Sequence, residues 1–130
     1  MKPNEEPMRI SLMNEEGTLR QRIENAAAMF VGEYLRVTPK SISIDLHSAN
    51  VIVTLQNIVP PVEKDFAHGD AERRTLLEKC YGDAFDAAKE DFEQTLANIM
   101  NRHVESSMLR IHPESGNGVM IVNLAGQPPA

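Results

Sequence analysis

The amino-acid sequence predicts a single α+β domain in which an α-β-β unit occurs twice. Two segments repeat apolar residues at intervals of three and four, which is typical of an amphipathic helix. Each is followed by two short segments of alternating or β-branched residues, which predict a pair of strands. The chain has 130 residues, the size of one ordinary domain. We expect a four-stranded, mostly antiparallel sheet with two helices on one face.

The first unit is predicted to begin at Thr18, a residue type suited to the N-cap of a helix. The helix should end before Pro39, because the residue that precedes a proline avoids helical backbone. Its apolar face consists of Leu19, Ile23, Ala26, Ala27, Phe30, Val31 and Tyr34. Residues 41–46 alternate strictly and residues 51–55 are mostly β-branched, so they predict a hairpin that the Pro60–Pro61 pair terminates.

A connector over residues 62–69 leads to a second, longer helix, predicted for residues 71–103 with Asp70 as its N-cap. Its apolar stripe consists of Leu77, Tyr81, Ala84, Ala88, Phe92, Leu96 and Ile99. Such a helix is about 50 Å long, which exceeds what a domain of this size needs. We therefore expect it either to break near Gly82 or to pack in part on a second subunit.

The last two strands are predicted at residues 108–112, which alternate, and 119–122, which are apolar on both faces, with a hairpin turn at Asn117–Gly118. The last strand should be central in the sheet or covered by a partner. Together with the long helix, it predicts a homodimer. Residues 23–55 and 92–124 share the same order of elements, which indicates a duplicated unit.

The ends of the chain are predicted to lie outside the domain, which spans residues 18–125. Residues 1–17 contain Pro3 and Pro7 and no periodic apolar pattern, so they predict a mobile N-terminal tail. Residues 126–130 predict a short C-terminal tail.

Composition limits the compartment and the partners. The formal net charge is -6, and an acidic chain with scattered basic residues repels phosphate backbones, so we expect no nucleic-acid partner. A single cysteine rules out an intramolecular disulfide and fits a reducing compartment. We expect no transmembrane segment, because no run of about 18 apolar residues occurs, and no signal peptide. These features predict a soluble, cytoplasmic protein.

No catalytic residue, metal site or cofactor is predicted, and we expect the protein not to be an enzyme. The histidines are His47, His68, His103 and His112, and none has the spacing of a metal site. Cys80 lies within the long predicted helix, where a cysteine is usually an inert core residue. The acidic residues Asp83, Asp86, Glu90, Asp91 and Glu93 favour a solvated helix face over a cation site. Gly116 and Gly118 predict a turn, since no lysine of a phosphate loop follows them.

The second face of the predicted sheet offers the one candidate binding site. Alternation places Arg110 and His112 together on it, where they can hold a small anion such as bicarbonate. This arrangement predicts, as one function, a homodimeric small-anion-binding sensor.

Two stretches, VGEYLRVTPKSISIDLHSANVIVTLQNIV and FEQTLANIMNRHVESSMLRIHPESGNGVMIVNL, carry a family resemblance that extends over residues 18–125. In the order of their elements they resemble the MpsC-like proteins, described as a component of a sodium-translocating, membrane-potential-generating system and associated with bicarbonate uptake. Residues 36–39, 60–63 and 121–124 depart from the family pattern, so the chain resembles a divergent member.

The resemblance implies an accessory or regulatory protein of a membrane ion or bicarbonate transport system. Its implied partner is a membrane transporter subunit, and its implied place is peripheral to the inner face of the membrane. A chain without a spanning segment cannot itself carry an ion across a bilayer, so it would act through protein–protein contacts. The resemblance implies no catalytic residue.

Overall fold

The computed structural model describes residues 5–126, with side chains described from residue 17 onward. The elements follow the order α1 (Glu5–Phe30), a π-helical turn η1 (Val31–Leu35), β1 (Ser41–Leu46), β2 (Asn50–Gln56), α2 (Pro61–Ala67), α3 (Ala71–Met100), β3 (Val104–His112) and β4 (Asn117–Leu124). The predicted α+β class is confirmed.

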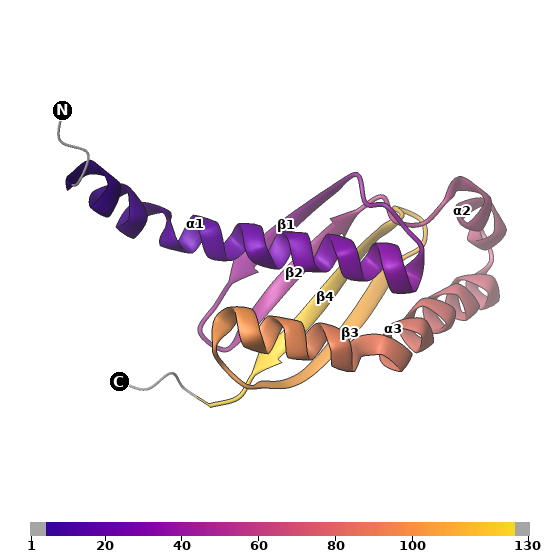
Figure 1. Cartoon of the computed structure of the whole chain (residues 1–130). Coiled ribbons are helices and arrows are strands. Elements are labelled where there is room, and N and C mark those ends of the chain that lie inside the picture. Colours follow the sequence, from indigo (N-terminus) through magenta and orange to yellow (C-terminus); the bar gives the residue numbers. More distant parts are fainter. Residues whose placement is uncertain (1–4, 127–130) are drawn as a thin grey trace.

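The four strands form one sheet in the order β1-β2-β4-β3, and all neighbouring strands are antiparallel. Helices α1 and α3 lie side by side across one face of this sheet (Figure 1). The predicted sheet and its helix-covered face are confirmed, whereas the duplication of the two halves stays a prediction. Strand β4 lies between β2 and β3, so it is central in the sheet, which was one of the two alternatives predicted for it.

The first helix begins earlier than predicted. It starts at Glu5, so the N-cap predicted at Thr18 is wrong and residues 5–17 are helical. Pro7 does not prevent this, because it lies in the first turn, where a missing backbone N–H costs no helical hydrogen bond. A single glycine, Gly17, lowers helix stability by only about 1 kcal/mol. Residues 1–4 and 127–130 of the predicted tails lie outside the described residues.

Three phenylalanines hold the helical layer together above the sheet. Phe30 from α1 lies with its ring centroid 5.6 Å from that of Phe85 and 5.0 Å from that of Phe92, both on α3. All three are buried, as are the sheet residues Val53, Met120 and Val122. Large aromatic side chains contribute the most apolar area to a core, so this cluster is the main contact between the two helices.

Helix α3 is continuous through Gly82, so the first of the two predicted alternatives, a break there, is wrong. The predicted N-cap is confirmed, since the Asp70 carboxylate accepts a hydrogen bond of 3.1 Å from the backbone N–H of Arg73. The first half of α3 packs within the same chain: the Tyr81 hydroxyl donates to Glu63 of α2 over 2.7 Å. Burial, and then this hydrogen bond, raise the pKa of Tyr81. The length of α3 therefore does not require a second subunit.

The predicted connector contains the short helix α2, which the sequence analysis missed. The loop before α2 is tied to the β3–β4 turn, because the backbone N–H groups of Ile58 and Val59 both donate to the Gly116 carbonyl, at 2.7 and 3.2 Å. Ile58 is 2% exposed and lies against Gly118, where any side chain would intrude. The signal in the sequence was Pro61, because proline suits the first helical position.

This contact predicts that Gly118→Ala destabilises the fold by about 1–3 kcal/mol, as overpacking in a core does. A β-carbon at residue 118 would lie 2.8 Å from Ile58 Cδ1. The additional change Ile58→Val removes that atom and should recover part of the loss. Urea unfolding followed by circular dichroism measures both. The matched control is Gly82→Ala, which meets nothing within 4 Å and should stabilise α3 by about 0.5–1 kcal/mol. Equal stabilities for Gly118→Ala and the wild type would contradict the prediction.

Candidate functional site

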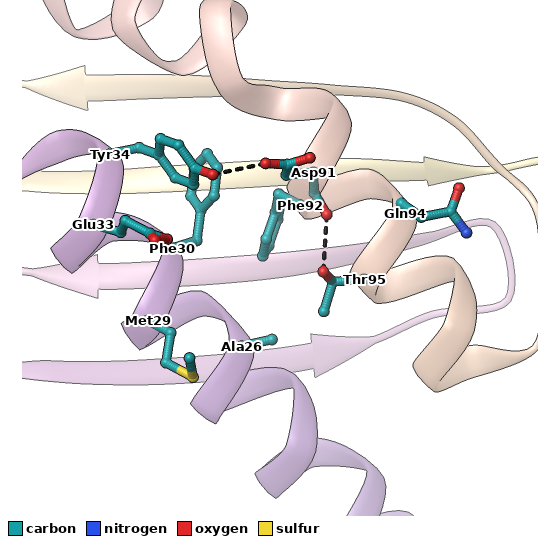
Figure 2. Close-up of a pocket in the computed structure, with 9 residues that line it drawn as sticks. All are labelled: Ala26, Met29, Phe30, Glu33, Tyr34, Asp91, Phe92, Gln94 and Thr95. Carbon is teal, nitrogen blue, oxygen red and sulfur yellow. Dashed lines mark hydrogen bonds between the residues drawn. The ribbon is translucent and has the colours of Figure 1, made fainter.

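A groove lies between the two long helices on the side away from the sheet (Figure 2). Its volume is about 340 Å³. The residues that line it are Ala26, Met29, Phe30, Glu33, Tyr34, Asp91, Phe92, Gln94 and Thr95. Phe30 and Phe92, members of the buried aromatic cluster, form its floor. The groove is therefore apolar at its base and rests on the buried aromatic cluster.

A hydrogen bond crosses the groove at one end. The Tyr34 hydroxyl donates to the Asp91 carboxylate over 2.7 Å, which links η1 to α3 (Figure 2). The π-helical turn ends at Arg36, which has a φ of 59° and whose backbone N–H donates to the Val31 carbonyl. Single π-helical turns often occur at functional sites. Here the turn sets the position of Tyr34 opposite Asp91.

The rim of the groove is acidic. Glu33 of η1 and Asp91 of α3 both line it, and Glu90 lines a second hollow next to the Tyr34–Asp91 bond. This second hollow is otherwise formed by Ala84, Ala87 and Ala88 of α3, so it too has an apolar wall. Such a surface suits an apolar segment that carries a positive charge, and it disfavours an anion.

Met29 is the most exposed large apolar side chain described, with 75% of its surface accessible. It lies at the groove edge opposite Thr95 (Figure 2). The Thr95 hydroxyl donates a hydrogen bond to the backbone carbonyl of Asp91 over 2.8 Å. Flexible methionine side chains are common on surfaces that bind apolar segments. The sequence analysis missed this groove. The signal that could have indicated it was Met29, a large apolar residue that lies outside the apolar helix face predicted to be buried.

The predicted anion ligands lie on the opposite side of the protein. Arg110 and His112 are both exposed and share the sheet face that the helices leave open, as predicted. The Arg110 guanidinium makes no hydrogen bond or ion pair with any residue in the described part of the chain. His112 Nδ1, in contrast, accepts a hydrogen bond of 3.2 Å from the backbone N–H of Ser115. His112 therefore stabilises the β3–β4 turn and has only Nε2 left for a ligand.

The other candidate residues remain apart. Cys80 is exposed, so the expectation that it belongs to the inert core is wrong: it projects from α3 beside the buried stripe. Within residues 17–126, no three His, Cys, Asp or Glu side chains gather as a metal site would require. Two carboxylates of the acidic segment pair with lysines on the same helix, Lys79–Asp83 at 2.7 Å and Lys89–Asp86 at 3.8 Å.

These features define the class of protein: a two-layer α+β domain with two accessible surfaces. These surfaces are the groove between the helices and the open face of the sheet, and both suit contacts with other molecules. None of the helices within residues 5–126 combines the length and the apolar character that crossing a membrane requires.

The family follows from a comparison with family models. The model described as "Na+-translocating membrane potential-generating system (MpsC)" matches residues 15–126, which is most of the chain, and the protein belongs to this family. The description implies a role in a sodium-translocating system at a membrane. Searches of curated proteins and of solved structures gave no match.

The bond across the groove predicts the titration of Tyr34. Donation to Asp91, and then the charge of that carboxylate, raise the pKa of the Tyr34 phenol above its ordinary value of 10.0. Because the bond needs the protonated phenol, the bond is intact at a pH below the raised pKa of Tyr34 and is lost as the pH rises through that pKa. In a Tyr81→Phe background, Tyr34 is the sole tyrosine, and its ultraviolet absorbance reports ionisation.

Asp91→Asn should lower the pKa of Tyr34 towards 10.0, whereas Glu33→Gln should change it far less, since Glu33 is the weakest of its causes. An unchanged pKa of Tyr34 in Asp91→Asn would show that the bond does not persist in solution.

Proposed function

We propose that this protein is an accessory or regulatory component of a membrane ion transport system, and that it acts by binding a membrane transporter subunit. Membership of the MpsC family supports the transport system. The observation that carries the mode of action is the groove between α1 and α3, with its apolar floor and acidic rim.

The chemistry of the groove specifies what it would bind. Phe30, Phe92 and the exposed Met29 offer apolar contact, while Glu33 and Asp91 offer negative charge on either side. The cytoplasmic loops of membrane proteins are enriched in lysine and arginine next to apolar spans. A short amphipathic segment from such a loop matches the groove in both respects. This proposal places the protein in the cytoplasm, at the inner face of the membrane.

The test is a tagged pull-down from mildly solubilised native membranes, read by mass spectrometry. We expect recovery of one transporter subunit with the wild type and a loss of at least tenfold with Glu33→Lys/Glu90→Lys. This variant reverses the charge of Glu33 at the groove and of Glu90 in the neighbouring hollow, and it keeps the Tyr34–Asp91 bond.

The matched control is Glu78→Lys/Glu105→Lys, which makes the same change of net charge outside the groove and should retain the transporter. If the wild type recovers no membrane protein under several detergents, or if both double variants recover it equally, the proposal is wrong.

A second candidate function is a homodimeric sensor that binds a small anion such as bicarbonate. The free guanidinium of Arg110 favours it, because an exposed arginine beside a histidine offers several donors to an oxyanion. Sodium bicarbonate should then raise the melting temperature more than sodium chloride at equal ionic strength and pH. Arg110→Gln should abolish the difference, and Lys40→Gln, on the chain before β1, should keep it. Identical melting curves in both salts would exclude this function.

A further inference from the structure

The sheet face opposite the helices is uncovered by any described element, yet its centre is apolar (Figure 1). Strand register aligns Ile52 of β2 with Ile121 of β4, and Ile121 with Met108 of β3. Val119 lies in the next row of β4. Met108 is 37% exposed, and the other three are half-buried only by their neighbours on the sheet. A contiguous apolar centre within a polar border is typical of an interface between proteins.

The two edges of this face carry opposite charges. Asp45 lies on β1 at the end of the row that contains Ile52, and Arg110 lies on β3 at the end of the row that contains Val119. Both side chains are exposed, and neither makes a hydrogen bond or an ion pair with another described residue. The face thus carries an acidic side chain at one edge, an apolar middle and a basic side chain at the other edge.

We propose that a second copy of this chain covers this face, in a symmetric dimer whose two-fold axis runs parallel to the strands between β2 and β4. Rotation about such an axis places β1 of one copy over β3 of the other and β2 over β4. The apolar rows then meet each other, and Asp45 lies over the partner's Met108, one row along the strand from the partner's Arg110, whose long side chain reaches towards it; this contact occurs twice in the dimer. A surface that is complementary to itself in this way is what a two-fold interface requires.

The dimensions fit a weak dimer. Four strands spaced about 4.8 Å apart and about 25 Å long present roughly 500 Å² per copy, or roughly 1,000 Å² in total. This is at the lower limit for specific interfaces, so we expect a dissociation constant of roughly 1–100 μM. The groove between α1 and α3 lies on the other side of the sheet and stays free in this dimer. The proposal therefore does not depend on the proposed contact with a transporter subunit.

The experiment measures the mass of the full chain by sedimentation equilibrium from about 1 to 300 μM at low salt. The wild type should pass from monomer to dimer over this range. Ile121→Glu buries a charge in the proposed interface and should leave a monomer throughout, with an unchanged circular dichroism spectrum. The control Met29→Glu, on the helical side, should dimerise as the wild type does. A wild type that stays monomeric at 300 μM would overturn the proposal.

A charge exchange tests the orientation and does not depend on the stability of the Ile121 variant. Asp45→Arg and Arg110→Asp should each weaken the dimer at least tenfold, because each places like charges opposite one another. The double variant restores opposite charges and should recover most of the affinity. A dimer that is insensitive to both single changes and to Ile121→Glu would show that the copies associate through another surface, such as a strand edge.

Discussion

The arrangement of this protein depends on the contact of Phe30 with Phe85 and Phe92, because those rings fix α1 against α3. The two helices cover only one side of a four-stranded sheet, and the aromatic cluster fills the space between them and the central strands. Aromatic pairs prefer tilted or edge-on geometries, which limits how the helices can slide past each other. The floor of the groove consists of two of these same rings, so the shape of the candidate site follows from the packing of the core.

The same arrangement gives the protein two different accessible surfaces on opposite sides of the sheet. One side has a groove with an acidic rim, and the other has an open sheet face with an apolar centre between Asp45 and Arg110. A component that binds a membrane partner with one side and a second copy with the other would present two equivalent grooves. Two grooves held together would strengthen binding to a transporter that itself has two copies of the docking segment.

Sequence reasoning found the elements with strong local patterns. All four strands follow from alternation or β-branching, and the N-cap Asp70 follows from its residue type. The errors have local causes as well. The helix start was placed at Thr18 because the upstream segment lacks apolar periodicity, and α2 was missed because seven residues are too few to show a period. A break near Gly82 and packing on a second subunit were the two alternatives for the long helix, because the sequence did not reveal that α2 packs against the first half of α3.

The sequence by itself determined the α+β class, the order of most elements and the common face of Arg110 and His112, since these depend on residues close together in the chain. Membership of the MpsC family is likewise a property of the sequence. Only the tertiary structure decided the groove, because Tyr34 and Asp91 are 57 residues apart and meet through the packing of α1 on α3. It also decided that β4 is central and that one sheet face is open, because strand order depends on long-range pairing that no local pattern encodes.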